Sequence, residues 1–290
     1  MQDFTLNSGS RPAVRAFASQ ASADGAGVKI QRVAGFQVPA LSPFLMIDEI
    51  RSENPDDYIA GFPPHPHRGI ETLTYMLSGE FEHQDHLGNR GAIRQGGAQW
   101  MRAGRGIIHS EMPSQGEGGM HGFQLWINMA ARDKMVKAAW RDIQPDEIRE
   151  LPLDDHGSLA RLITGEWTVN DAGVSAPMTD TAADAAVADI RLAAGAEITL
   201  PLPKDHSAMA FIYRGGLQTE HAEVTRGNLV LYGEGEALQL RALADGAGLL
   251  LLHGKPLNEP VVHYGPFVMN TREQIEQTLR DYNNGTLTDY

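Results

Sequence analysis

Two pairs of potential metal ligands, each with one residue between its members, constrain this chain more than any other feature. His65 and His67 lie in the segment PPHPHRGIETLTYMLSGE, and His109 and Glu111 lie further along in AGRGIIHSEMP. Side chains two positions apart on a β-strand point to the same face of the sheet, so each pair presents two donors to one side. Three neutral imidazoles and one carboxylate that converge from two strands would form a four-ligand site for a first-row divalent metal ion.

Histidine pairs of this kind also occur without a metal ion, and a lone H-x-H motif is more often a surface strand with two hydrated imidazoles. The second pair and its carboxylate favour a metal site here. In addition, six of the eleven histidines crowd into one fifth of the chain, at positions 65, 67, 83, 86, 109 and 121. The sequence therefore predicts one metal centre that is drawn from both pairs.

The residues after the first pair predict that its strand continues into a barrel wall. Alternate positions carry Glu71, Leu73 and Tyr75, on the parity of the two histidines. If the strand has no bulge, the two histidines therefore lie at the start of a face whose later residues pack in the apolar interior. Glu71 then points inward as a further ligand, as a partner that orients a histidine, or as a carboxylate in water at the strand end. We expect the orienting role, because Glu111 already supplies a carboxylate beside His109.

Turn signals and short apolar alternations predict two β domains of similar kind. The chain contains 31 glycines and 16 prolines, as many short strands joined by tight turns require. The alternation is lost in a charged segment at 130–151, which we interpret as the connection, and then resumes; YMLSGE at 75–80 is echoed weakly by FIYRGG at 211–216. The later copy has no H-x-H motif. Residues 1–135 are therefore predicted to form a metal-binding domain, and residues 136–290 a domain without a metal site.

The last segment predicts a short helix in the second domain. A helix-start signature at Asn270 or Thr271 is followed by apolar residues at helical spacing, Ile275, Leu279 and Tyr282. We expect the apolar side of this helix to pack on a barrel wall.

Charge and composition argue against several partners and locations. With 24 Lys and Arg against 37 Asp and Glu, the formal net charge of -13 disfavours a sequence-independent contact with nucleic acid phosphates. The absence of cysteine excludes disulfides and thiolate ligands. No segment approaches the roughly eighteen apolar residues of a membrane span, and the N-terminus lacks the apolar core of a secretory signal. We expect a soluble, cytoplasmic protein, and a monomer, because two fused barrels can cover each other's exposed sheets.

Four segments resemble the pirin family in order and spacing: PHPHRGIET, QWMRAGRGIIHSEMP, HGFQLWIN and GKPLNEPVVHYGPFVMNT. They also fit the wider cupin pattern, in which Gly106 stands three positions before His109. The resemblance implies an all-β bicupin fold with two antiparallel β-barrel, or jelly-roll, domains. It implies one divalent metal ion in the first barrel, Fe(2+) ahead of Mn, Ni, Cu, Zn or Co, on the ligands His65, His67, His109 and Glu111. Many cupins instead take the carboxylate from the position of Glu71.

The same resemblance implies a quercetin 2,3-dioxygenase reaction, in which dioxygen cleaves a flavonol and carbon monoxide is released. Glu111 would act as general base toward the flavonol hydroxyl. Trp126 or Phe123 would hold the flat rings, and Met46 would line the pocket mouth. The alternative is a metal-dependent regulator that binds a protein partner, such as a transcription factor or a metabolic enzyme. A barrel that keeps its metal ion without catalysis is a third interpretation.

Overall fold

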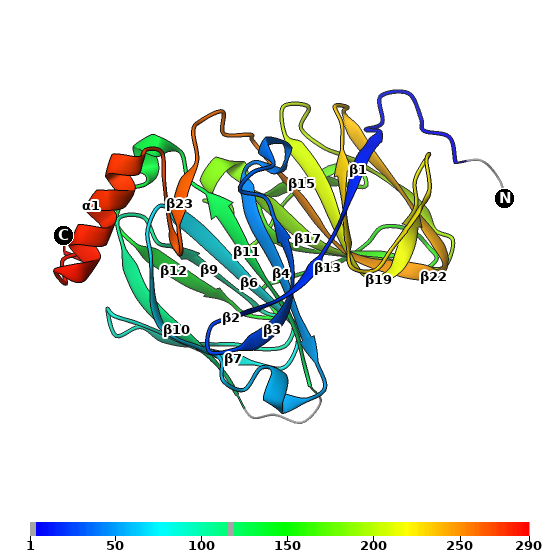
Figure 1. Cartoon of the computed structure of the whole chain (residues 1–290). Coiled ribbons are helices and arrows are strands. Elements are labelled where there is room, and N and C mark those ends of the chain that lie inside the picture. Colours follow the sequence, from blue (N-terminus) through cyan, green and yellow to red (C-terminus); the bar gives the residue numbers. More distant parts are fainter. Residues whose placement is uncertain (1–3, 115–118, 290) are drawn as a thin grey trace. The chain divides into compact units, whose positions relative to one another are not determined.

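The computed structural model describes residues 4–114 and 119–289 and shows a chain built almost entirely from antiparallel strands (Figure 1). Within these residues there is one α-helix, α1 (Arg272–Asn283), and there are four 3-10 helices: η1 (Pro39–Leu41), η2 (Pro55–Asp57), η3 (Ala131–Asp133) and η4 (Ala182–Asp184). The prediction of an all-β chain with a short C-terminal helix is confirmed. In the described part of the chain, no helix combines the length and the apolar character that crossing a bilayer requires.

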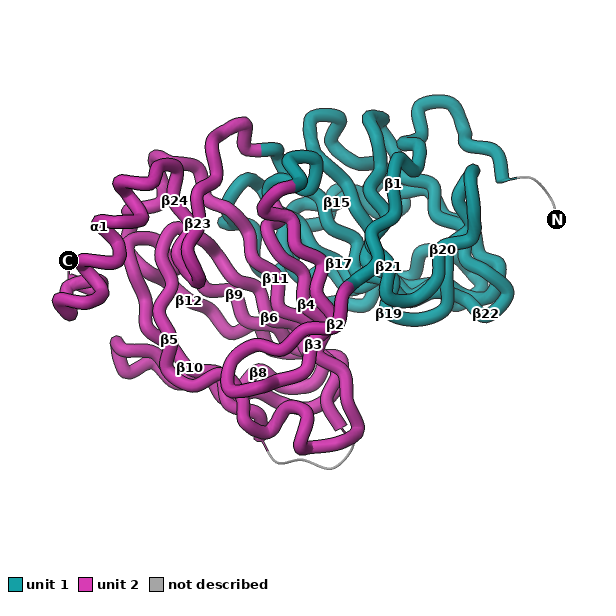
Figure 2. The backbone as a smooth tube through the Cα atoms, in the orientation of Figure 1, with its two compact units in different colours: residues 1–19, 38–43, 148–256 teal, residues 20–37, 44–147, 257–290 magenta. Residues whose placement is uncertain are grey.

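The chain folds into two compact units that interleave along the sequence (Figure 2). Unit 1 comprises residues 1–19, 38–43 and 148–256, and unit 2 comprises residues 20–37, 44–147 and 257–290. This partition differs from the single division between residues 135 and 136 that the charged connection suggested. Long-range pairing explains the difference: β1 (Ala13–Ala18) pairs with β21 (Asn228–Tyr232) inside unit 1. The residues of α1, in turn, pack inside unit 2.

Unit 2 is built on two antiparallel sheets. The larger sheet has the strand order β12 (Ala139–Ile143), β9 (Ala98–Arg102), β6 (Ile70–Ser78), β11 (Met120–Asn128), β4 (Phe44–Ser52), β3 (Val28–Ala34) and β2 (Gln20–Asp24). The smaller sheet has the order β5 (Phe62–His67), β10 (Ile107–Pro113), β7 (Phe81–Asp85) and β8 (Arg90–Ile93). A separate hairpin pairs β23 (Val262–Tyr264) with β24 (Phe267–Met269).

Alternating apolar residues from both sheets form part of the core of unit 2. Ile30 and Ile50 of the larger sheet pack in one buried cluster with Phe81 and Ile93 of the smaller sheet. Strands whose inward side chains alternate with outward ones build such a core between two sheet faces. The two sheets of unit 2 thus enclose a common interior.

The chain turns sharply between β5 and β6, so the expected continuous strand from His65 to Tyr75 is wrong. Gly69 adopts a φ of +80°, and a Cβ atom there would lie 2.0 Å from the carbonyl oxygen of Val268. Only glycine fits this combination of a left-handed backbone and a close approach. Because β5 joins the smaller sheet and β6 the larger one, side-chain parity does not carry over from the histidines to Glu71.

Unit 1 has one large antiparallel sheet and one hairpin. The sheet runs in the order β1, β21, β19 (Ser207–Gln218), β22 (Ala237–Gly254), β17 (Ala186–Leu192), β14 (Leu159–Thr164) and β13 (Glu150–Pro152), with β18 (Glu197–Pro201) on β22 and β20 (Glu223–Thr225) on β19. The hairpin pairs β15 (Glu166–Val169) with β16 (Ala172–Ser175). Alanine, leucine and isoleucine side chains from these strands form its buried core.

Helix α1 begins and ends where its sequence predicts. Thr271 is the N-cap and forms a reciprocal capping box with Gln274, and Asn284 is the C-cap. Ile275 is buried in a cluster with Phe267 of β24. The apolar side of the helix therefore packs on the hairpin of unit 2.

Candidate metal centre

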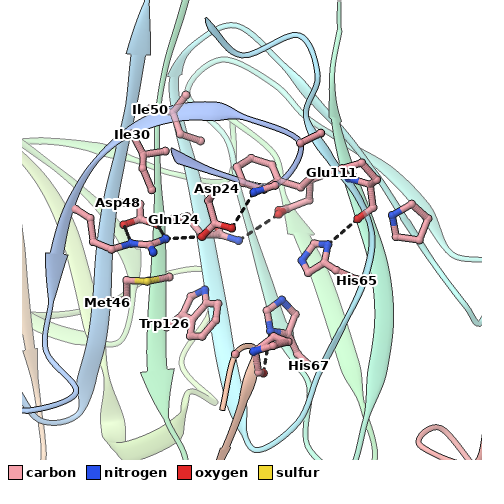
Figure 3. A pocket seen from close by; sticks show the side chains of 18 of the residues that line it. Asp24, Ile30, Met46, Asp48, Ile50, His65, His67, Glu111, Gln124 and Trp126 are labelled. Atoms are coloured by element: carbon pink, nitrogen blue, oxygen red, sulfur yellow. Dashed lines mark hydrogen bonds and ion pairs between the residues drawn. The ribbon is translucent and has the colours of Figure 1, made fainter. Parts of the chain in front are cut away.

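Three of the predicted ligands, His65, His67 and His109, come together on two adjacent strands of the smaller sheet. Strand β10 pairs antiparallel with β5, and His109 is the direct partner of His65. One ring nitrogen from each of the three lies within 4.8 Å of those of the other two. Figure 3 shows His65 and His67 at the cavity that they line.

Hydrogen bonds to backbone carbonyls set which nitrogen of two of these rings is available. His65 Nδ1 lies 2.8 Å from the Pro63 carbonyl oxygen, and His67 Nδ1 lies 3.3 Å from that of Pro266 (Figure 3). A carbonyl can only accept, so Nδ1 carries the proton in each ring and Nε2 keeps its lone pair. Among the described residues, Nε2 of His67 and of His109 is buried without a hydrogen-bond partner.

Burial keeps these imidazoles neutral. It lowers the pKa of His65, and it lowers the pKa of His67 and of His109 well below 6.5, with the neighbouring histidines adding to the effect for these two. Neutral imidazole is the form that binds a metal ion. Buried Nε2 lone pairs without partners are thus a donor set that fits a divalent cation.

Glu111 lies on the same face of β10 as His109, but its carboxylate is grouped with His83 and His109 and not with His65 and His67. Its carboxylate oxygens accept hydrogen bonds from Thr74 Oγ1 at 2.9 Å and from Gln124 Nε2 at 3.1 Å. Burial raises the pKa of Glu111 to about 7, although both hydrogen bonds favour the ionised form. Its ligand atom lies within 4.8 Å of those of His83 and His109, and it lines the same cavity as His65 and His67.

His83 is a site residue that the ligand motifs did not reveal. It lies on β7 directly opposite Glu111 of β10, and its Nδ1 lies 3.4 Å from Nδ1 of His109. Its ring stacks on Trp140, with 5.5 Å between the ring centroids, and burial lowers its pKa to about 4. The signal in the sequence that could have revealed His83 is the alternation of inward and outward positions along its strand. Positions 81, 83 and 85 of β7 are buried, and the two positions between them are exposed.

The expected orienting role of Glu71 is wrong. Glu71 is fully buried, where it accepts from Trp100 Nε1 at 2.9 Å and pairs with Arg102 at 2.7 Å. Thr74, three positions along β6, reaches Glu111, and residues an odd number apart on a strand face opposite sides of the sheet. In the described residues, neither group of possible metal ligands includes Glu71.

A cavity of about 690 Å³ opens beside the histidines. Trp126 and Met46 line it, as expected, whereas Phe123 is fully buried and is not among its lining residues. The reason is again alternation, because Gln124 and Trp126 of β11 point into the cavity and Phe123 lies on the opposite parity. The remaining lining residues are Asp24, Gly25, Ala26, Ile30, Arg32, Phe36, Asp48, Ile50, Phe62, Pro63, Pro64, His65, His67, Glu111, His263, Gly265 and Pro266.

Several of these lining residues could not be assigned from local sequence. His263 and Pro266 belong to the carboxy-terminal hairpin, and the ring of His263 stacks on Phe36 with 4.1 Å between centroids. Arg32 and Asp48 come from the neighbouring strands β3 and β4, where they are direct partners. Together these elements line one cavity with possible metal ligands, apolar side chains and a few charged ones, an arrangement typical of sites for small organic molecules.

Comparison with known proteins identifies the family of this chain. Two family models match in order along the chain: Pirin at residues 27–127 and the Pirin C-terminal cupin domain at residues 187–288. A Vibrio cholerae protein named "Putative quercetin 2,3-dioxygenase" is 53% identical over 272 residues, which cover 94% of this chain and 96% of that protein. Pirin of Mus musculus is 36% identical, over 92% of this chain and 90% of that protein.

A solved structure shares the fold. The crystal structure of quercetin 2,3-dioxygenase from Acinetobacter baumannii superposes with a TM-score of 0.87 at 31% identity, and the match covers 96% of this chain and 98% of that one. The bicupin architecture expected from the four segments is thereby confirmed. Because relatives match over nearly their whole length and both family models fit, the chain belongs to the pirin family of the cupin superfamily.

Proposed function

We propose that this protein is a mononuclear metal dioxygenase of the quercetin 2,3-dioxygenase type, which cleaves a flavonol with dioxygen and releases carbon monoxide. The observation that carries the proposal is the convergence of three imidazoles beside a cavity of about 690 Å³, with the buried carboxylate of Glu111 close to one of them, His109. The names of the Vibrio cholerae and Acinetobacter baumannii proteins support the same reaction.

His65, His67, His109 and Glu111 are the proposed ligands, and iron is the proposed metal. Imidazole and carboxylate donors also accept manganese, cobalt, nickel, copper and zinc. When bound, the ion supplies a Lewis-acidic positive charge that favours an anionic oxygen donor such as a deprotonated flavonol hydroxyl. Burial keeps the three histidines neutral, and neutral ligands would not cancel the positive charge of the ion.

Glu111 is proposed to act also as general base. Thr74 and Gln124 fix its carboxylate, and each of its oxygens retains a further lone pair that can accept a proton from the substrate. A positioned base of this kind contributes typically 10²–10⁴-fold to a rate. Because Glu111 lines the cavity, its carboxylate can be reached by a hydroxyl of a bound molecule.

The apolar wall is proposed to hold the flavonol rings. Trp126 and Phe36 meet edge to face with 6.2 Å between centroids, and both line the cavity. Aromatic side chains bind flat rings through dispersion and quadrupole contacts. The regulator interpretation is not favoured, since these features and the names of the relatives point to small-molecule chemistry.

The test is turnover of quercetin in air by the iron-loaded protein. We expect loss of the flavonol absorbance together with release of carbon monoxide, and neither change after the metal ion is removed. Glu111→Gln should keep the fold and reduce the rate by roughly 10²–10⁴-fold. The proposal fails if the loaded protein evolves no carbon monoxide with any of iron, manganese, nickel, copper or cobalt.

A further inference from the structure

An arginine held by two carboxylates forms part of the cavity wall. Arg32 of β3 donates from Nε to Asp48 Oδ1 at 2.8 Å and from Nη2 to Asp48 Oδ2 at 2.6 Å. The same Nη2 donates to Asp24 Oδ2 at 2.5 Å. Both carboxylates bind the edge of the guanidinium formed by Nε and Nη2, and the bidentate pair with Asp48 fixes the plane of the group.

This arrangement leaves two donors of Arg32 for a ligand. A guanidinium has five N–H groups, and the three bonds above use the one on Nε and both on Nη2. Nη1 donates to no group in the described residues, and the Arg32 side chain is 24% exposed. Because Arg32 lines the cavity, we infer that its two Nη1 donors can reach a molecule that occupies it.

The net charge of Arg32 and its two carboxylates determines which kind of ligand group can bind to Nη1. One guanidinium between two carboxylates has a net charge of about -1, so a carboxylate or sulfate on the ligand is repelled. A neutral hydroxyl suits the site better, since its oxygen accepts from Nη1 and its hydrogen can be donated to Asp24, which is 46% exposed.

The strand register connects this site to the metal centre. Asp48 of β4 is the direct partner of Gln124 on β11, and Gln124 donates to Glu111. Figure 3 shows Gln124 between Asp48 and Glu111. A flat molecule with one hydroxyl at Glu111 can therefore extend along this wall toward Arg32.

We propose that Arg32, held by Asp48 and Asp24, is a specificity-determining residue that binds a neutral ring hydroxyl of the flavonol other than the hydroxyl that reacts. The inference rests on the proposed function, because it takes a flavonol as the occupant of the cavity. The inference predicts that flavonols with further ring hydroxyls are preferred over those that carry only the reacting 3-hydroxyl.

The test compares two probes that share the reacting 3-hydroxyl and 4-keto group. Quercetin carries further ring hydroxyls and 3-hydroxyflavone carries none. Binding is measured without oxygen on the metal-loaded protein, by quenching of tryptophan fluorescence, and KM and kcat are then measured in air. We expect the unaltered protein to bind quercetin at least about tenfold more tightly, as one hydrogen bond to a charged donor implies.

Arg32→Gln should weaken quercetin binding by about tenfold or more and change 3-hydroxyflavone binding by less than about twofold. KM for quercetin should rise while kcat stays within about twofold. Lys29→Gln is the matched control, because it removes an ion pair with Asp57 from the same strand outside the cavity lining. It should leave both affinities unchanged.

Arg32→Lys keeps the charge beside Asp48 and loses the fork, so it tests the idea even if Arg32→Gln does not fold. It should lower the preference for quercetin by at least about threefold. Equal weakening of both probes, or none, would show that Arg32 only supports the wall and would overturn the inference while the turnover test still stands. If the unaltered protein binds neither flavonol, the inference and the proposed function fail together.

Discussion

Metal affinity should depend on pH through a single proton, that of Glu111. In the metal-free protein, burial raises the pKa of Glu111 to about 7, so below this value an incoming cation must displace a proton from the carboxylate. Burial lowers the pKa of His65 and lowers the pKa values of His67 and His109 well below 6.5, so we expect the three imidazoles to be already neutral in the same range. Affinity should therefore fall as pH falls, by about tenfold from pH 8 to pH 6 for one proton with a pKa of about 7.

The assay is competition for Zn²⁺ against a chromophoric chelator between pH 6 and pH 8, with calorimetry in two buffers to count released protons. We expect close to one proton released per ion at pH 6 and almost none at pH 8. Glu111→Gln should bind more weakly at pH 8 and show little further change down to pH 6. An affinity that is constant over this range would refute the carboxylate as a ligand, and a fall of a hundredfold or more would show that the histidines are protonated after all.

Three other changes probe the ligands and their support. His109→Ala should lower metal content measured by elemental analysis, and a content equal to that of the unaltered protein would reject His109 as a ligand. Gly69→Ala should lower the free energy of unfolding by more than about 1–2 kcal/mol in denaturant titrations, since it adds a clash with Val268 to the cost of a left-handed backbone; an unchanged midpoint would contradict this. Asp281→Asn should cost about 1.5–3 kcal/mol at pH 7, because Asp281 pairs with the buried Arg68. Burial raises the pKa of Asp281, but the hydrogen bonds from Arg68 and Gln277 outweigh it and lower this pKa in the folded protein, so the loss should begin to shrink as pH falls below about 4. A loss that stays undiminished down to the lowest pH at which the protein still folds would count against it.

The elements that local spacing determines could be predicted from the sequence. His65 and His67, like His109 and Glu111, are two apart on strands, and this spacing brings each pair to one face whatever the rest of the chain does. The capping box at Thr271 is equally local, because its hydrogen bonds join residues three apart. The four segments that resemble the pirin family predict that these motifs come together in a bicupin fold.

The alternation of side chains along a strand does not continue where the backbone leaves the strand. The count from His67 to Glu71 passes through Gly69, whose left-handed conformation ends β5 and starts a strand in another sheet. One such residue is enough to reverse the predicted face of everything that follows. Glu71 therefore lies against Trp100 and Arg102 instead of beside a ligand.

Partners far along the chain could not be predicted from spacing at all. His83 approaches His109 only because β7 pairs with β10, and Arg32 approaches Asp48 only because β3 pairs with β4. Each pairing depends on the register of strands that the sequence does not specify locally. The cavity wall, unlike the ligand motifs, is thus a product of the tertiary fold.

The carboxy-terminal hairpin supports the metal centre although it contains none of the four proposed ligands. The Pro266 carbonyl accepts from His67 Nδ1 across 199 residues of sequence and so determines which nitrogen of His67 keeps its lone pair. His263, Gly265 and Pro266 also line the cavity beside His67. A chain that ended at residue 256 would retain all four proposed ligands and yet lose this bond and these walls. Its His67 would be more hydrated and easier to protonate, because the low pKa of His67 arises first from burial, so proton competition would weaken metal binding in a fragment that still contains every ligand.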